Sequence, residues 1–180
     1  MVSNTRQINN LALVGFMGTG KSSVGRLVAD QLRFSFLDTD ELIEIRAGKS
    51  IRDIFAQEGE VAFREYERSM VAELSARKNT VIATGGGLAA NEENLASLKS
   101  HALVICLWAS PEKIWERVRN QTHRPLLNEP DPLAKIHQLL IDRQPYYRQA
   151  DVLLNTAVRS LNEVAQQVIH QFHLMRSAEW

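Results

Sequence analysis

The stretch GFMGTGKSSVG, residues 15–25, decides how the rest of this sequence is interpreted. From Gly15 to Ser22 it has the pattern GxxxxGK[ST], with Lys21 as its lysine. A short apolar run precedes the pattern and a segment with helical spacing follows it, which is the context that a phosphate-binding loop needs. The alternative, a glycine turn beside a surface lysine, does not require that context. The sequence therefore predicts a loop that binds phosphate groups.

The expected chemistry of this loop follows from its residue types. Glycines let backbone N–H groups turn inward around an anion, and the N-terminus of the following helix adds a partial positive charge. Lys21 supplies an ammonium group for the outer phosphates, and the Ser22 hydroxyl is offered to Mg²⁺. We expect the phosphates of ATP to contact Gly18, Thr19, Gly20, Lys21, Ser22 and Ser23.

The rest of the chain alternates short apolar runs with longer helical patterns, which predicts a parallel sheet covered by helices in an α/β fold. The expected strands are 11–14, 34–37, 81–83, 102–107 and 152–154. The expected helices are 21–32, 41–47, 50–58, 60–76, 91–97, 111–119, 133–147 and 162–175. The polar segment 1–9 is expected to be a loosely held leader. The proline-rich segment 120–132 has neither period and is expected to be a lid.

Composition narrows the possible partners and compartments. The 180 residues, with 21 basic and 21 acidic side chains, are enough for one α/β domain, which we expect to span residues 1–180. A balanced charge gives no basic surface for nucleic acid. No apolar stretch approaches the roughly 20 residues of a membrane span, and the first apolar run does not resemble a signal peptide. A single cysteine, Cys106, suits the reducing cytoplasm, where we expect a monomer.

Several kinds of protein contain such a phosphate loop. A GTPase switch would need NKxD and DxxG, and neither string occurs. Motor and transporter ATPases generally have larger nucleotide domains and further signatures, which are missing here. A small kinase is the better interpretation.

Two acidic residues, Asp38 and Asp40, stand at the end of the second expected strand. In an extended strand, residues two apart point to the same face, so both carboxylates are expected to face the phosphate end of the sheet. One would hold Mg²⁺ and the other would accept a proton from an attacking hydroxyl. Capping of the helix that follows is an alternative explanation of Asp40.

Three consecutive glycines, Gly85, Gly86 and Gly87, follow the third expected strand. They suggest a place where the backbone comes very close to a ligand, and a flexible turn is the alternative. Among the arginines, Arg64 and Arg143 fall in helical segments, where a solvated face is the default. Three others, Arg117, Arg119 and Arg124, lie beside or within the expected lid and are better placed to meet a triphosphate.

Taken together, several strings of the sequence resemble those of shikimate kinases, in order and at the spacing of that family. They are GFMGTGKSSVG, FLDTDELI, IFAQEGEVAFREYE, TGGG, RPLL and DRQPYY, and the match spans about residues 11–168. The resemblance implies transfer of the γ-phosphoryl group of ATP to the 3-hydroxyl of shikimate, a step of chorismate and aromatic amino-acid biosynthesis. It also implies a fold like that of nucleoside monophosphate kinases, with five parallel strands in the order 2-3-1-4-5 and a lid.

The same resemblance implies roles for individual residues. Asp40 matches the carboxylate that binds the shikimate hydroxyls and is the candidate base. Arg64 and Arg143 match the arginines that grip the shikimate carboxylate, a pairing that suits a guanidinium group. The glycines Gly85, Gly86 and Gly87 are expected beside them, and Phe55 and Phe63 are expected to line the pocket.

On the nucleotide side, Ser22 and Asp38 resemble the magnesium pair and Lys21 the phosphate lysine. Arg124 resembles the lid arginine that reaches the phosphates of ATP, and Arg117 the residue that packs near adenine. Arg159 is expected in the adenine loop, where the Asp-Thr common in the family is replaced by Asn155-Thr156.

Two alternatives remain open at this point. A kinase of the same fold for another small acid, such as gluconate, would share the need for arginines. A regulatory nucleotide-binding module would keep the loop without phosphoryl transfer.

Overall fold

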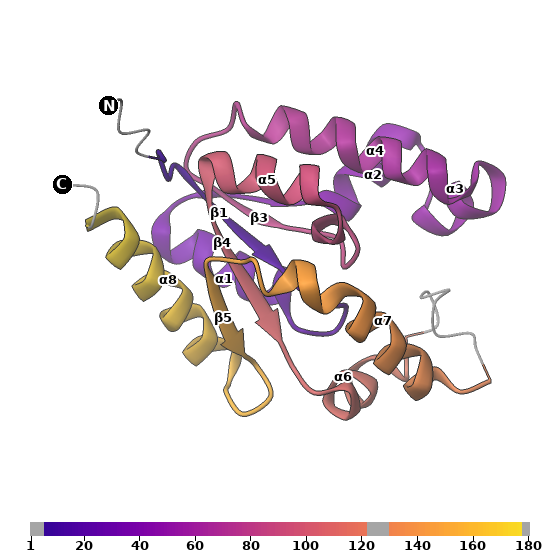
Figure 1. The fold of residues 1–180 in the computed structure, drawn as a ribbon. Helices are drawn as coiled ribbons and strands as arrows, with labels where there is room; N and C mark the ends of the chain where they lie inside the picture. Colours follow the sequence, from indigo (N-terminus) through magenta and orange to yellow (C-terminus); the bar gives the residue numbers. More distant parts are fainter. Residues whose placement is uncertain (1–5, 122–129, 178–180) are drawn as a thin grey trace.

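The computed structural model describes residues 6–121 and 130–177, and a five-stranded sheet forms the centre of the molecule (Figure 1). All five strands are parallel and lie in the order β2-β3-β1-β4-β5, which confirms the expected fold class. Each strand bound lies within one residue of its expected position. The strands are β1 (Asn10–Val14), β2 (Ser35–Asp38), β3 (Thr80–Ala83), β4 (Ala102–Trp108) and β5 (Val152–Asn155).

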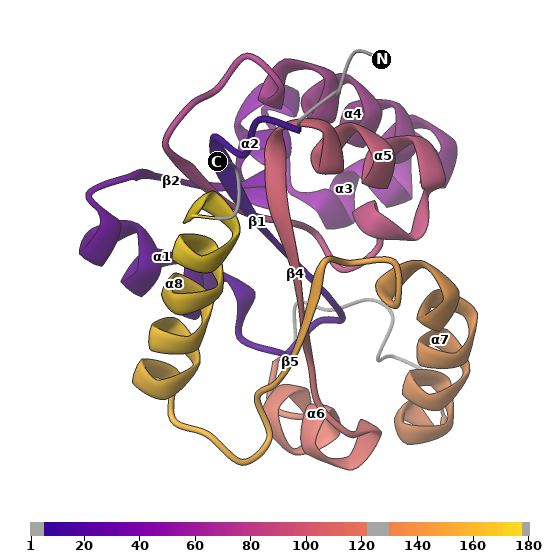
Figure 2. The same cartoon turned by 60° about the vertical axis from the view of Figure 1, so that its left-hand side comes forward.

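Helices cover both faces of this sheet. Helices α1 and α8 pack on one face, and the remaining helices lie over the other, as Figure 2 shows. The helices are α1 (Lys21–Leu32), α2 (Thr39–Ala47), α3 (Ile51–Gln57), α4 (Gly59–Leu74), α5 (Glu92–His101), α6 (Pro111–Val118), α7 (Pro132–Tyr147) and α8 (Leu161–Ser177). A short 3₁₀ helix, η1 (Leu88–Ala90), precedes α5. No helix in residues 6–121 and 130–177 is long and apolar enough to cross a membrane.

The sheet separates two hydrophobic cores because successive residues of a strand point to opposite faces. In β1, Leu11 and Leu13 pack with α1 and α8, while Ala12 and Val14 belong to the core beneath the other helices. All five residues of β1 are buried. A strand that is buried on both faces has a continuous apolar sequence, which is why central strands such as β1 and β3 were visible in the sequence.

Polar side chains mark the start of most helices. The N-caps of α2, α3, α5, α6 and α7 each accept a hydrogen bond from a backbone N–H of the first turn; they are Asp38, Ser50, Asn91, Ser110 and Asp131. Such caps satisfy N–H groups that have no partner within the helix. Helix α1 differs because its N-cap is Gly20, which has no side chain to cap the helix.

Residues 6–9 are held more firmly than the expected loose leader. The Arg6 guanidinium forms hydrogen bonds of 2.8 and 2.7 Å with the Asp151 carboxylate, before β5. Ile8 is buried, and the Asn9 backbone N–H donates to the His101 carbonyl. An ion pair with a residue far along the chain cannot be read from local pattern, so this part of the expectation was wrong.

The expected lid, residues 120–132, contains the gap between the described ranges, which is residues 122–129. Arg124 and the other residues of 122–129 lie outside the described residues. The C-terminal end of the segment is helical, because Asp131 caps α7 and Pro132 is its first residue.

We expect Asp151→Ala to lower the free energy of unfolding by about 2 kcal/mol at neutral pH, because it removes several charge-assisted hydrogen bonds. Although burial opposes the effect, hydrogen bonds from Arg6 and from the Val104 backbone N–H lower the pKa of the Asp151 carboxyl. The contribution of the Asp151 carboxylate to the free energy of unfolding is therefore complete above the unfolded-state pKa of about 3.9. It is lost as the pH falls through the lower pKa of the folded state. Urea unfolding near pH 7 and pH 3 measures this, with the exposed Asp142→Ala as control. An equal loss at both pH values would contradict the prediction.

Candidate active site

The phosphate loop connects β1 to α1 at the carboxyl end of the sheet. Gly15 has a φ of 130°, and a Cβ placed there would lie 2.2 Å from the Leu107 carbonyl oxygen, so no side chain fits. Gly20 has a φ of 94°, which favours glycine, and serves as the N-cap of α1. No acidic residue occupies the first turn of α1. The positive end of this helix therefore faces the loop without a capping side chain or an acidic side chain in its first turn, as an anion site requires.

Lys21 is held inside this loop. Its side chain is buried, and its ammonium group donates a hydrogen bond of 2.8 Å to the Phe16 carbonyl. The Thr19 hydroxyl donates to the same carbonyl at 2.8 Å. The loop thus places a positive charge next to the uncapped helix terminus, and the two together favour a bound phosphate.

Ser22 and Asp38 lie side by side, as the sequence predicts. The Ser22 hydroxyl donates a 2.6 Å hydrogen bond to one Asp38 carboxylate oxygen. The other oxygen accepts from the Asp40 backbone N–H at 3.0 Å and caps α2. A hydroxyl and a carboxylate are hard oxygen donors of the kind Mg²⁺ takes when it also binds phosphates, so the pair fits this ion.

Asp40 reaches the site in a different way from the one the sequence suggests. Helix α2 begins at Thr39, so Asp40 lies in its first turn and does not share a strand face with Asp38. The cap of this helix is Asp38 and not Asp40, which also removes the capping explanation of Asp40. The shared strand face and the capping role were wrong because the Asp38 side chain starts the helix two residues earlier than periodicity indicated. The expected location at the phosphate end of the sheet is confirmed, because both aspartates line one cleft with Lys21.

A different charged side chain lies against each of the three glycines after β3. A Cβ at Gly85 would lie 2.3 Å from an Asp40 carboxylate oxygen, and one at Gly87 would lie 2.8 Å from the Arg64 guanidinium. At Gly86 a Cβ would lie 3.3 Å from the Met17 backbone nitrogen and 3.6 Å from Arg143. The sequence led us to expect close approach of a ligand. In the structure it is the protein's own charged groups that need this space.

Arg64 is oriented by two carboxylates on its own helix, α4. It donates to Glu67 at 2.7 Å and to Glu60 at 2.8 and 3.2 Å. Burial raises the pKa of the Glu67 carboxyl, even though the hydrogen bond from Arg64 and its charge act in the opposite direction. The guanidinium also lies 5.4 Å from the centre of the Phe63 ring, and the Phe63 and Phe55 rings are 4.8 Å apart. Arg64 is therefore a positioned cation, although about a third of its side chain stays exposed to solvent.

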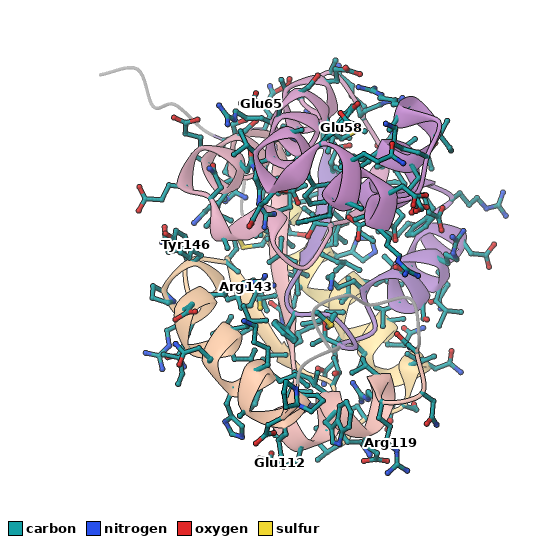
Figure 3. The ribbon with its side chains drawn as sticks, turned by 90° about the vertical axis from the view of Figure 1, so that its right-hand side faces the viewer. Glu58, Glu65, Glu112, Arg119, Arg143 and Tyr146 are labelled. Atoms are coloured by element: carbon teal, nitrogen blue, oxygen red, sulfur yellow. The ribbon has the colours of Figure 1, made fainter. Side chains whose placement is uncertain are left out.

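Arg143 approaches the same glycines from α7. It donates a hydrogen bond of 3.1 Å to the Gly86 carbonyl, and its guanidinium lies 5.3 Å from the centre of the Phe16 ring. In Figure 3 its side chain lies toward the centre of the molecule, whereas Arg119 lies at the edge and is exposed. Two guanidinium groups therefore meet at one glycine loop, an arrangement that can hold a planar anion such as a carboxylate.

Arg117 forms hydrogen bonds with the phosphate loop and with the segment after β5. It donates to the Gly18 carbonyl at 3.1 Å and to the hydroxyl and carbonyl of Thr156 at 3.0 and 2.7 Å. It thereby ties the phosphate loop to the segment after β5. Arg159 is exposed and donates to the Asn155 carbonyl at 2.9 Å.

A cleft of about 330 Å³ lies between the phosphate loop and the two aspartates. Its walls come from the phosphate loop, the ends of β2 and β3, and α6. They comprise Met17, Gly18, Gly20, Lys21, Ser22, Ser23, Asp38, Asp40, Thr84, Gly86, Arg117 and Gln121. Arg64 and Arg143 do not line this cleft, but each lies against a glycine of the loop that follows β3.

Sequence reasoning gave no role to three residues that support this site. Glu67 belongs to the quoted FREYE string, Thr39 stands between the two aspartates, and Tyr147 belongs to DRQPYY. Each is buried and each forms a hydrogen bond with a site residue. The only signal in the sequence was their position inside motifs quoted for other residues.

A phosphate loop, a neighbouring aspartate pair and two arginines at one glycine loop define an ATP-dependent small-molecule kinase of the P-loop class. The chain belongs to the shikimate kinase family, whose family model, described as shikimate kinase, matches residues 17–173. It is 43% identical over 165 residues to the shikimate kinase of Caldanaerobacter subterraneus subsp. tengcongensis, covering 92% of this chain and 96% of that protein. It is 41% identical over 172 residues to that of Thermodesulfovibrio yellowstonii, covering 96% and 99%.

Solved structures agree with this assignment. The shikimate kinase from Acinetobacter baumannii in complex with shikimate has a TM-score of 0.88 and 37% identity, covering 93% of this chain and 94% of that one. A gluconokinase from Sinorhizobium meliloti has a TM-score of 0.62 at 16% identity, covering 96% and 97%, which is a likeness of fold alone. Family membership therefore favours shikimate kinase over the gluconate alternative.

We expect Glu67→Gln to become more stable relative to the natural protein as the pH rises from about 4, near the unfolded-state pKa of a glutamate, to about 8. A carboxyl whose folded-state pKa is raised contributes its stability below the unfolded-state value of about 4.3 and loses it as the pH rises through the folded-state pKa. Glutamine does not titrate, so the difference in free energy of unfolding should shift in favour of the variant. Urea unfolding across this range measures it, with Glu65→Gln, exposed on the same helix, as control. A flat or opposite trend for Glu67→Gln would contradict the prediction.

Proposed function

We propose that this chain transfers the γ-phosphoryl group of ATP to the 3-hydroxyl of shikimate, giving shikimate 3-phosphate and ADP. The observation that carries this proposal is the meeting of Arg64 and Arg143 at the glycine loop that also receives Asp40. Shikimate presents a carboxylate to the two cations and hydroxyls to the aspartate. The relative from Acinetobacter baumannii, solved in complex with shikimate, supports the same acceptor here.

The nucleotide would bind through its phosphates at the loop between β1 and α1. Its expected contacts are Gly18, Thr19, Gly20, Lys21, Ser22 and Ser23, together with the N-terminus of α1. Ser22 and Asp38 would hold Mg²⁺, which offsets the negative charge of the phosphates when bound. The 2.6 Å contact between these two side chains supports the assignment.

In the proposed reaction, Asp40 accepts the proton of the shikimate hydroxyl as that oxygen attacks the γ-phosphorus atom. Lys21 and the loop N–H groups stabilise the negative charge that spreads over the transferring phosphoryl group. Arg64 and Arg143 hold the acceptor through its carboxylate, so that the hydroxyl keeps its orientation. The backbone of Gly85, Gly86 and Gly87 completes the acceptor side, and Phe55 and Phe63 contribute apolar surface for the carbocycle.

Three further arginines belong to the nucleotide side of the proposal. Arg117 would lie near adenine, which is supported by its bonds to the phosphate loop and to Thr156. Arg159 would contact the nucleotide in the same region. Arg124, outside the described residues, keeps the role that the family resemblance implies, contact with the phosphates of ATP.

We extend the proposal to the state of the protein in the cell. Residues 1–180 would act as one domain and as a monomer in the cytoplasm, with no nucleic-acid or membrane partner. The balance of 21 basic and 21 acidic residues supports this. So does the lone Cys106, whose burial raises its thiol pKa to about 12 and keeps it unreactive.

The direct test is Mg²⁺-dependent release of ADP from ATP with shikimate, with gluconate and with neither acid. We expect saturable release with shikimate alone. Release with gluconate alone would move the activity to another acceptor, and nucleotide binding without acid-dependent release would favour a regulatory module.

Asp40→Asn should lower kcat by about 10² to 10⁴, because it removes the proton acceptor while keeping the shape of the side chain. KM for ATP should change little, since the phosphate loop is untouched. Steady-state kinetics measures both. Turnover equal to that of the natural protein would remove Asp40 from the mechanism.

Arg64→Lys should raise KM for shikimate by about tenfold to 100-fold and change kcat much less, because a lysine keeps the charge but loses the two-pronged contact with a carboxylate. Arg68→Lys, on the exposed side of the same helix, is the matched control. An equal effect of the two substitutions would argue against a specific role of Arg64.

A further inference from the structure

Two buried hydroxyl groups hold the glycine loop after β3. The Thr39 hydroxyl accepts a hydrogen bond of 2.9 Å from the Gly85 backbone N–H. The Tyr147 hydroxyl donates one of 2.5 Å to the Gly86 carbonyl. Thr39 is fully buried and Tyr147 is 6% exposed. The two side chains come from different helices, α2 and α7, so the loop is attached to both.

The Thr39 contact bears on Asp40, the next residue in the chain. A Cβ at Gly85 would lie only 2.3 Å from the Asp40 carboxylate, so the backbone of Gly85 and this side chain are in close contact. Because interiors are densely packed, a shift of Gly85 changes the space available to Asp40. The Thr39 hydroxyl thus fixes the surface against which Asp40 rests.

The Tyr147 contact bears on Arg143, one helical turn earlier on α7. Both side chains donate to the Gly86 carbonyl, so this oxygen fixes the loop and the guanidinium together. Burial raises the pKa of the Tyr147 hydroxyl to about 12, so it keeps its proton and remains a donor at neutral pH. In a trans peptide the next N–H points opposite to the carbonyl, so the same contact orients the Gly87 N–H away from α7.

We propose that Thr39 and Tyr147 are positioning residues of the kinase reaction: Thr39 places the base Asp40, and Tyr147 places the carboxylate-binding group Arg143. This inference rests on the proposed function. It assigns neither residue a contact with substrate. The two roles are separate, because the Thr39 hydroxyl supports the chemical step and the Tyr147 hydroxyl supports binding of the acceptor.

The first test removes the hydroxyl of Thr39 with little change of volume. Thr39→Val should lower kcat about tenfold with KM for ATP within about twofold, a loss equal to one hydrogen bond. Thr39→Ser keeps the hydroxyl and should restore most of kcat. Failure of serine to restore turnover, at a melting temperature equal to that of the natural protein, would overturn the role of the hydroxyl.

The second test removes the hydroxyl of Tyr147 and uses its neighbour as control. Tyr147→Phe should raise KM for shikimate about tenfold, with kcat and KM for ATP within about twofold. Tyr146→Phe, on a residue that lies at the edge of the molecule in Figure 3, should leave all three unchanged. An unchanged KM for shikimate in Tyr147→Phe would overturn the inference for this residue.

The natural protein, assayed beside these variants, separates the two proposals. If it shows no shikimate-dependent release of ADP, the proposed function fails and the positioning roles fail with it. Suppose instead that the natural protein is active, but that Thr39→Val and Tyr147→Phe both show a lower kcat and higher KM values for ATP and for shikimate. If these changes are in proportion to the fall in melting temperature, only the positioning roles are overturned. Separate effects on kcat and on KM for shikimate, at retained melting temperature, support them.

Discussion

Charged groups of both signs meet in this protein at a loop that has no side chains. Asp40 comes from α2, Arg64 from α4 and Arg143 from α7, and each rests against one of the glycines 85–87. A Cβ at the first or third glycine would displace the charged group beside it, so glycine keeps these groups in place by leaving room and not through an unusual φ. Because the loop leaves this space, three helices can bring one carboxylate and two guanidinium groups to one place.

The topology of the sheet puts this glycine loop next to the phosphate loop. Strands β1 and β3 are neighbours, with Leu13 paired to Ala83, so the segments that follow them leave the same edge side by side. The position of a Cβ on Gly86 lies 3.3 Å from the Met17 backbone, inside the phosphate loop. A doubly wound parallel sheet collects such loops at its carboxyl edge. The two loops are therefore adjacent as a consequence of strand order.

The site cations are held by internal acceptors. Lys21 bonds to the Phe16 carbonyl, Arg64 to Glu67 and Glu60, and Arg143 to the Gly86 carbonyl. Fixed donors need little reorganisation to meet an anion, which is why such placement suits a site for phosphate and carboxylate groups. Burying Glu67 beside Arg64 has a cost, seen in the raised pKa of its carboxyl. The arrangement exchanges some stability for a cation in a defined orientation.

The sequence by itself determined the order of strands and helices along the chain and the phosphate loop, because periodicity and motif spacing are local properties. The pairing of Ser22 with Asp38 was implied by the family resemblance alone. Local pattern misplaced Asp40, since one side-chain cap moved the start of α2, and it missed the contact of Arg6 with Asp151. The quoted motifs contained Thr39, Glu67 and Tyr147 but gave them no role. Only the tertiary structure decided which side chains meet at the glycines, because helix packing brings together residues up to about 100 positions apart, and such contacts leave no local signal.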